Sequence, residues 1–170
     1  MEQLLVSLRR LMREMGVEEY AVCGGHAIDL FLGNKTRPHK DLDVAVFWED
    51  RDRIIRFMLH TGWRVFEPCG GRRLHRIRSV ADQRRARDNI WCVAPENGHY
   101  KFRWCGKGRY TACQDGAEQE SLDFVEFLFN FREEGDFLYD KNPVIRMKLG
   151  RAIQRKDGTP YLAPELGTAI

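Results

Sequence analysis

The chain has 170 residues, of which 43% are hydrophobic and 31% are charged, and its net charge is +3. This composition excludes a disordered chain, and so small a net charge gives no argument of its own for a nucleic-acid partner. Arginines interrupt the first apolar segment, and no later apolar stretch is long enough to span a bilayer. We therefore expect a cytoplasmic protein without a membrane segment, folded as one domain over residues 1–170.

The first half of the chain alternates helical and strand patterns. Apolar residues at helical spacing end at Gly16, which predicts an amphipathic helix. The apolar run before Gly24 predicts a buried strand, and the segment from Gly25 to Gly33 predicts a helix. The segment 41–47 predicts a second strand. A further helix should end at Gly62, and a short strand should follow it.

The second half contains more strands. Aromatic segments at 89–95, 99–105 and 108–113 predict short strands, and the separators "ENG" and "GKG" resemble hairpin turns. The segment "SLDFVEFLFNF" has the strongest strand pattern of the chain. Near the end, "KDGTP" predicts a turn. The expected fold class is α+β, with a mixed sheet and helices packed on one side.

Residues 71–88 form the most basic tract of the chain. Apolar residues recur within it, so we expect a strand or helix with a solvated basic face rather than a nucleic-acid surface. The alternative predicts RNA binding that depends steeply on salt and is lost when Arg84, Arg85 and Arg87 are neutralised.

The five cysteines are odd in number and include no C-x-x-C pair. A zinc site needs clustered ligands at short spacing, and none is present in the sequence. We expect reduced and mostly buried thiols.

Asp41 and Asp43 lie on a predicted strand, where alternate side chains share a face. Two carboxylates held close together repel, so one of them should resist ionisation unless a cation joins them. Mg²⁺ binds such oxygen ligands together with water and substrate phosphates. The alternative is a solvated strand end with no ligand.

Nearby residues favour the metal hypothesis. Gly24 and Gly25 lie between a strand and a helix, where glycine allows backbone N–H groups to approach an anion. Arg37 and His39 precede the aspartates and can both bind phosphate. We also expect Gly25→Val to abolish nucleotide binding with little loss of fold. Together these residues suit phosphoryl or nucleotidyl transfer.

The segment "GGHAIDLFLG…TRPHKDLDV" resembles the signature of the nucleotidyltransferase superfamily related to DNA polymerase β. It is most similar to the aminoglycoside 2''-nucleotidyltransferase family. The resemblance covers most of the chain, densely over residues 23–47 and again at "DGTPYLAPEL". The matched residues are Gly24, Gly25, Ala27, Ile28, Asp29, Leu32, Gly33, Thr36, Arg37, His39, Asp41 and Asp43.

The resemblance implies a polymerase-β-type fold with about five strands, three carboxylates and two Mg²⁺ ions between the protein and an NTP. Asp41 and Asp43 would be two of the carboxylates. The third is Glu126 or Asp123, and the position of Glu126 before an apolar strand favours it. Asp29 would make local hydrogen bonds that fix the loop before Asp41.

The implied activity is transfer of NMP, with AMP favoured, from an NTP to a hydroxyl of a small-molecule acceptor, as in aminoglycoside resistance. The family's C-terminal helical part is short or missing here, which leaves the acceptor open. The alternatives are an NTP-binding or antitoxin-type interaction module with little turnover, and an RNA-directed nucleotidyltransferase. A homodimer or a protein partner also stays open.

Overall fold

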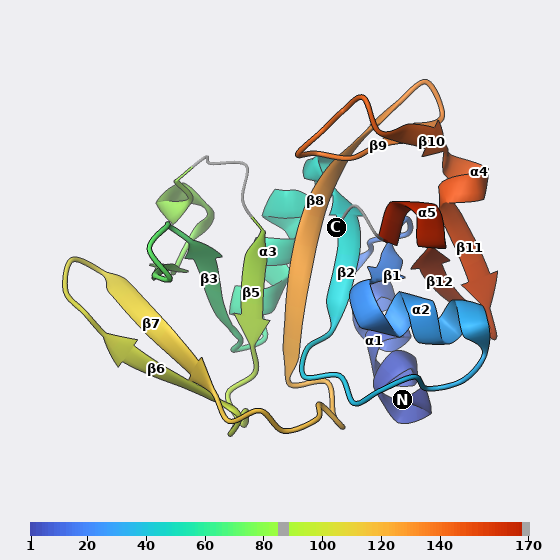
Figure 1. The fold of residues 1–170 in the computed structure, drawn as a ribbon. Helices are drawn as coiled ribbons and strands as arrows, with labels where there is room; N and C mark the ends of the chain where they lie inside the picture. The colour runs from blue at the N-terminus through green and yellow to red at the C-terminus, as the bar shows by residue number, and fades with distance from the viewer. Residues whose placement is uncertain (85–88, 168–170) are drawn as a thin grey trace.

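The computed structural model describes residues 1–84 and 89–167. A large mixed β-sheet forms its centre, with the first and third helices on one side of it (Figure 1). The helices are α1 (Glu2–Met15), α2 (Gly24–Leu32), α3 (Arg51–His60), α4 (Leu149–Ala152) and α5 (Pro164–Gly167), with 3₁₀ turns η1 (Trp48–Asp50) and η2 (Val80–Asp82). The strands are β1 (Ala21–Cys23), β2 (Asp43–Phe47), β3 (Arg64–Pro68), β4 (Leu74–Ile77), β5 (Ile90–Val93), β6 (Tyr100–Trp104), β7 (Arg109–Gln114), β8 (Phe124–Glu133), β9 (Asp136–Leu138), β10 (Arg146–Lys148), β11 (Ile153–Lys156) and β12 (Thr159–Leu162).

The strand order in the described residues is β11-β12-β1-β2-β8-β5-β3-β4-β7-β6, and β9 and β10 continue from the end of β8. The pairs β1–β12 and β2–β8 are parallel, and the other pairs are antiparallel. The mixed sheet and the α+β class are as the sequence predicts. The expectation of about five strands is wrong for this chain, because the sheet contains twelve strands in the described residues.

Helices α1 and α3 cover one face of the sheet. Their amphipathic patterns bury Leu8 and Met12 from α1 and Ile54 from α3 in one cluster with Val44 and Phe127. The first helix ends as predicted, because Gly16 caps it with a left-handed backbone conformation that glycine adopts without strain. Because this cluster is closely packed, the middle strands are a rigid support for the side chains on their opposite face.

The opposite face of β1 and β2 is covered by the C-terminal elements. Leu166 of α5 packs with Cys23, Ala45 and Phe47, whose side chains alternate with those that face α1 and α3. The expectation that all helices pack on one side of the sheet is therefore wrong. Leu128 of β8 packs against the same cluster, so the C-terminal segment covers the second face of the sheet from β1 to β8.

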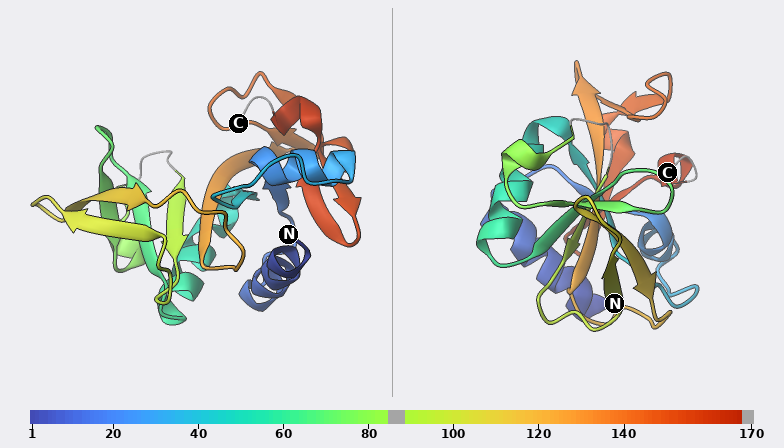
Figure 2. Two further views of the ribbon diagram at one scale, coloured as in Figure 1. Left: turned by 60° about the horizontal axis from the view of Figure 1, so that its bottom comes forward. Right: turned by 90° about the vertical axis from the view of Figure 1, so that its left-hand side faces the viewer.

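Residues 64–84 and 89–114, which we call the wing, extend the sheet to one side of the other described residues, which we call the body (Figures 1 and 2). β6 and β7 pair as an antiparallel hairpin, which confirms the turn predicted at "GKG". The predicted hairpin turn at "ENG" is wrong, because β5 pairs with β3 and β8 and not with β6. The hairpin packs over the face of β3 and β8, since Phe102 stacks on Phe66 and Tyr100 stacks on Phe124, each with ring centroids 4.4 Å apart.

The basic tract 71–88 begins with β4 and η2, so its described part is a strand and a 3₁₀ turn, whereas Arg85 and Arg87 lie outside the described residues. All five cysteines are free. Cys23 and Cys92 are buried but Cys105 and Cys113 are exposed, so the expectation of mostly buried thiols holds only in part. Among the described helices, none combines the length and the apolar character that crossing a bilayer requires.

Candidate active site

The turn between β1 and α2 brings the chain directly against Asp43. Gly24 has φ of +62°, a conformation that side-chain-bearing residues rarely adopt. A Cβ atom at this position would lie 2.5 Å from Oδ2 of Asp43. Both the backbone conformation and the available space therefore require glycine at position 24.

Sheet register brings the carboxylates together. Asp43 is paired with Cys23 on one side and with Glu126 on the other. The backbone N–H of Glu126 donates a hydrogen bond to the carbonyl of Leu42, 2.9 Å away. Because neighbouring strands lie about 4.8 Å apart, the register places Glu126 beside Asp43. Asp123 lies before the first residue of β8 and is not paired with β2.

Burial and mutual repulsion disfavour the charged forms of Asp43 and Glu126. Burial, Glu126 and Asp41 together raise the pKa of Asp43 to about 8. Burial also raises the pKa of Glu126, and the amide of Asn89, which donates to Oε1 at 2.9 Å, opposes this rise. The sequence argument predicts that one of the paired acids resists ionisation, and the structure identifies it as Asp43.

The donor set fits Mg²⁺, because the carboxylates are hard oxygen ligands and a cation would relieve the unfavourable charge on Asp43. Among the described residues, no group of three or more His, Cys, Asp or Glu side chains closes around a space for a metal ion. That arrangement is compatible with Mg²⁺, which commonly takes one or two protein carboxylates and completes its shell with water and substrate phosphates.

A buried hydrogen-bond network supports the loop before Asp41. Asp29 has no exposed surface and accepts hydrogen bonds from the backbone N–H and the hydroxyl of Thr36. Its second oxygen lies 2.8 Å from Nε2 of His39. The prediction that Asp29 fixes this loop through local hydrogen bonds is confirmed.

Gly25 faces the same network. A Cβ atom at Gly25 would clash with the ring of His39, and it would lie 3.2 Å from the guanidinium of Arg37. The ring of His39 is buried and held by Asp29, so it cannot move away cheaply. The expectation that Gly25→Val leaves the fold almost intact is therefore corrected. Arg37 is exposed beside this turn, and phosphate binding by Arg37 and His39 stays a prediction.

Sequence reasoning missed several residues around the carboxylates. A cavity of about 200 Å³ is lined by Asp43, Glu126, Asn89, Tyr139 and Lys141, among others. Lys141 is close enough to favour the charged form of Glu126. No motif marks these residues, because they reach the site only through the pairing of β8 with β5 and through the loop after β9.

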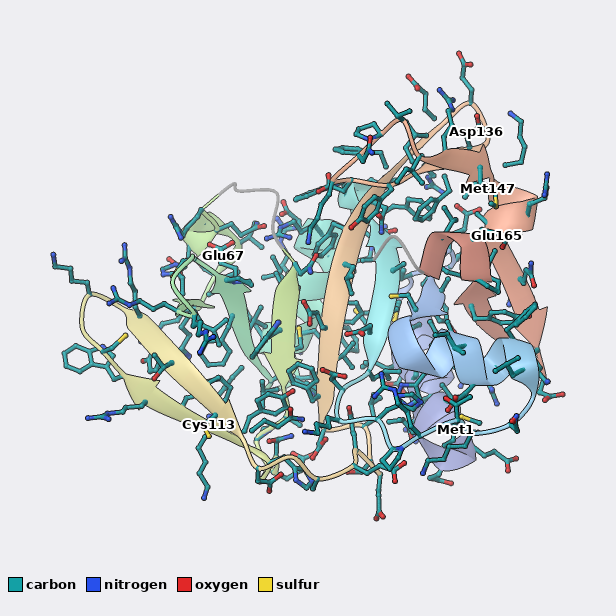
Figure 3. The ribbon with its side chains drawn as sticks, in the orientation of Figure 1. Met1, Glu67, Cys113, Asp136, Met147 and Glu165 are labelled. Atoms are coloured by element: carbon teal, nitrogen blue, oxygen red, sulfur yellow. The ribbon has the colours of Figure 1, made fainter. Side chains whose placement is uncertain are left out.

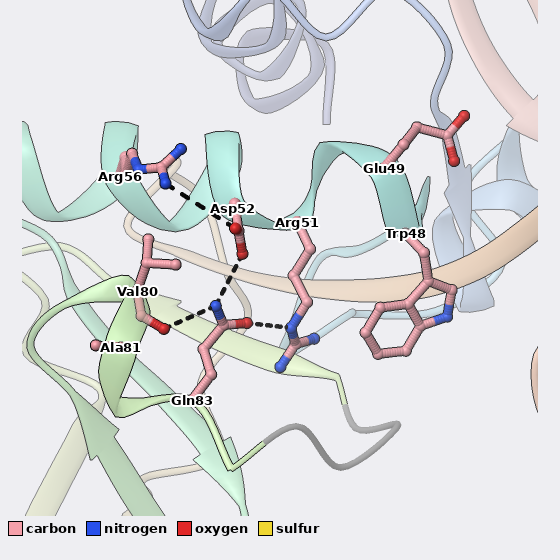
Figure 4. Close-up of a pocket in the computed structure, with 8 residues that line it drawn as sticks. All are labelled: Trp48, Glu49, Arg51, Asp52, Arg56, Val80, Ala81 and Gln83. Carbon is pink, nitrogen blue, oxygen red and sulfur yellow. Dashed lines mark hydrogen bonds and ion pairs between the residues drawn. The ribbon is translucent and has the colours of Figure 1, made fainter.

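A larger cavity of about 710 Å³ lies elsewhere, between α3 and the segment around η2 (Figure 4). Arg51 donates to Gln83 there, and Gln83 donates to Asp52. Arg51 also reaches the fully buried Glu67 at 3.4 Å. The cavity contains none of the three carboxylates, and its polar groups bond to one another, which is typical of a structural network.

Comparison with known proteins agrees with this geometry. The family model described as aminoglycoside-2''-adenylyltransferase matches residues 4–89, which is half of the chain and includes Gly24, Gly25, Asp41 and Asp43. No curated protein and no solved structure matches the chain significantly. From the matched segment, the chain belongs to the aminoglycoside-2''-adenylyltransferase family.

Proposed function

We propose that the protein is a metal-dependent nucleotidyltransferase with a polymerase-β-type fold, which transfers NMP from an NTP to a hydroxyl group. The observation that carries the proposal is that Asp43 lies beside Glu126 and against Gly24, at the N-terminus of α2. Asp41 is close enough to raise the pKa of both acids. The family name supports a nucleotidyltransferase role, favours AMP as the transferred group and makes an aminoglycoside hydroxyl the reference acceptor.

In this proposal Asp41, Asp43 and Glu126 would hold two Mg²⁺ ions between them, so that each ion would need only one or two of these carboxylates. When bound, the metal would stabilise the attacking and leaving oxygens of an in-line displacement. The acceptor oxygen forms a bond to the α-phosphorus of the NTP, and the bond from that phosphorus to the bridging oxygen breaks. Pyrophosphate leaves with that oxygen. Glu126 would take the hydroxyl proton, and burial, which raises the pKa of its carboxyl group, supports this role.

The chain's remaining site residues position the triphosphate. The Gly24–Gly25 turn exposes backbone N–H groups at the start of α2, a helix of nine residues whose N-terminus favours negative charge. Arg37 is exposed beside Gly25 and can bind phosphate with its guanidinium. His39 and Asp29 hold the backbone that connects this turn to Asp41.

The test is release of pyrophosphate from Mg²⁺–ATP with a panel of hydroxyl-bearing acceptors. Glu126→Gln should reduce the transfer rate at least about 100-fold, because it removes both a metal ligand and a proton acceptor. Asp123→Asn is the matched control, since Asp123 lies three residues earlier and outside the register with Asp43. Equal loss in both variants, or no loss in Glu126→Gln, would refute the assigned roles.

A further inference from the structure

Two polar side chains of the wing approach Glu126 from the side away from Asp43. β8 lies between β2 and β5, so Glu126 stands between Asp43 on one strand and the residues of β5 on the other. Trp91 is paired directly with Glu126, and Asn89 immediately precedes the first residue of β5. Because alternate side chains of an extended chain share a face, Asn89 and Trp91 both lie on the face of Glu126.

The amide of Asn89 holds one oxygen of this carboxylate. Its Nδ2 donates a hydrogen bond to Oε1 of Glu126 over 2.9 Å, which is a normal length for such a bond. An ionised carboxylate can accept at about four lone-pair positions. The bond from Asn89 therefore restricts how the carboxylate turns and leaves lone pairs of Oε2 for a ligand.

Trp91 offers a second donor to the same carboxylate. Its indole N–H is buried and makes no hydrogen bond of normal geometry within the described residues, which is an unfavourable state for a buried donor. It is nevertheless close enough to Glu126 to lower the pKa of that acid. The ring is held edge-to-face by Tyr100 and Phe124, with centroids 5.8 and 5.6 Å away. We therefore expect a turn of the carboxylate, and not of the indole, to complete this bond.

A second buried carboxylate shows what these donors do not supply. Glu67, labelled in Figure 3, lies on β3, which is the neighbour of β5 on the side away from β8. Glu67 is fully buried, and the guanidinium of Arg51 compensates its charge at 3.4 Å. Glu126 makes no ion pair within the described residues, since Lys141 acts on it from beyond ion-pair distance. Neutral donors orient a charge without cancelling it, so Glu126 stays available to a cation.

We propose that Asn89 and Trp91 are positioning residues, which hold Glu126 from the β5 side so that its carboxylate is directed toward Mg²⁺ and the acceptor hydroxyl. The inference rests on the proposed function. Asn89 acts before any ligand binds, and Trp91 completes the arrangement when the charged carboxylate turns toward a cation. Hydrogen-bonding partners of metal ligands typically contribute about 10–100-fold to metal affinity or activity.

The first experiment measures binding of Mn²⁺ alone, as a substitute for Mg²⁺, from the electron paramagnetic resonance signal of the free ion. Asn89→Ala should bind Mn²⁺ about 10–100-fold more weakly than wild type. The matched control is Asn97→Ala. Asn97 is also a buried asparagine of the wing, but its amide group bonds to the backbone of Asp123 and Tyr100. Asn97→Ala should therefore lose stability and keep the wild-type affinity for Mn²⁺.

The second experiment follows the indole N–H signals of the wild-type protein by nuclear magnetic resonance while Mg²⁺ is added. The signal of Trp91, identified by its absence from Trp91→Phe, should move downfield because its hydrogen bond forms when the carboxylate binds the cation. The signal of Trp104, which is 64% exposed at the end of β6, should stay in place. This measurement uses wild type, so it tests the inference even if Asn89→Ala does not fold.

Unchanged Mn²⁺ affinity in Asn89→Ala, or equal weakening in Asn89→Ala and Asn97→Ala, would overturn the role of Asn89. A Trp91 signal that does not respond to Mg²⁺ would overturn the role of Trp91. Absence of Mn²⁺ binding in wild type would overturn both roles. The melting-temperature shift with Mg²⁺–ATP is measured separately, and if it is intact, only this inference falls. A missing shift instead refutes the proposed function itself.

Discussion

The acidic part of the sheet and the wing hold their charges in opposite ways. Around β1, β2 and β8, the register of the strands fixes the positions of Asp43 and Glu126. The loop before Asp41 is held by hydrogen bonds to the buried Asp29. In the described wing, the cations are mostly exposed and have few acidic partners. Chemistry at a phosphorus atom requires oxygen atoms held in place, whereas solvated charges on a surface need no fixed position.

The difference has a direct consequence for mutations. Replacing a buried polar side chain that has a buried partner, such as Asp29 or His39, should disturb folding as well as function. Replacing an exposed cation of the wing should leave stability nearly unchanged. The predictions below test this division, beginning with the largest expected effect.

Two arginines provide the sharpest contrast. Arg51 is 5% exposed and faces Glu67, which is fully buried and also accepts a hydrogen bond from the backbone N–H of Arg84. Arg51→Met should cost about 3–5 kcal/mol, because it removes the cation that compensates this buried carboxylate. Arg76→Met should change the free energy of unfolding by less than about 0.5 kcal/mol, since Arg76 loses no acidic partner. Urea denaturation measures both, and similar losses would contradict the division.

A buried histidine should make the body sensitive to acid. Burial and the neighbouring His39 lower the pKa of His26 from 6.5 to about 4. In this interval the unfolded chain binds the proton more tightly, so stability is lost as pH falls from about 6.5 toward 4. The loss approaches on the order of 3 kcal/mol.

The measurement is thermal unfolding of wild type and His26→Phe across this pH range. The variant should lose this part of the acid sensitivity, and the control His60→Gln, at an exposed position on α3, should retain it. An unchanged pH profile in His26→Phe would show that another group causes the acid sensitivity.

Two glycines test the same division with a single methyl group. Gly25→Ala should destabilise the protein by about 1–3 kcal/mol, because the new Cβ overlaps the immobile ring of His39. Gly98 in the wing has open space at its Cβ position, so Gly98→Ala should stay within about 0.5 kcal/mol of wild type. Chemical denaturation measures both, and a neutral Gly25→Ala would show that His39 moves freely.

Local signals in the sequence predict much of the acidic part. Gly16 and Gly33 end helices as expected, and Asp43 begins β2. The predicted strand 41–47 is too long, because Asp41 lies in the loop before β2 and shares no strand face with Asp43. The segment that supports them is continuous in sequence from Gly24 to Asp43, so local patterns and the family resemblance both describe it.

The rest depends on which strands pair, and local patterns do not determine pairing. The turn at "ENG" resembles a hairpin, but β5 instead joins β3 to β8 and thereby brings Trp91 and Asn89 to Glu126. The choice between Glu126 and Asp123 likewise depends on the register of β8 against β2.

The central claim is that Asp41 and Asp43 form a divalent-metal site that holds an NTP. The most direct measurement is thermal unfolding of wild type, Asp41→Asn and Asp43→Asn, each with and without Mg²⁺–ATP. At ligand concentrations about 100-fold above Kd, wild type should melt about 5–10 °C higher. Both variants should lose this shift, and Asp43→Asn should be at least as stable as wild type without ligand, because it removes a buried carboxylate that its neighbours repel.

A wild-type protein without any ligand-dependent shift, or variants that shift as wild type does, would contradict the metal site. The protein would then be better explained as an interaction module that has the family's matched segment but does not transfer nucleotides.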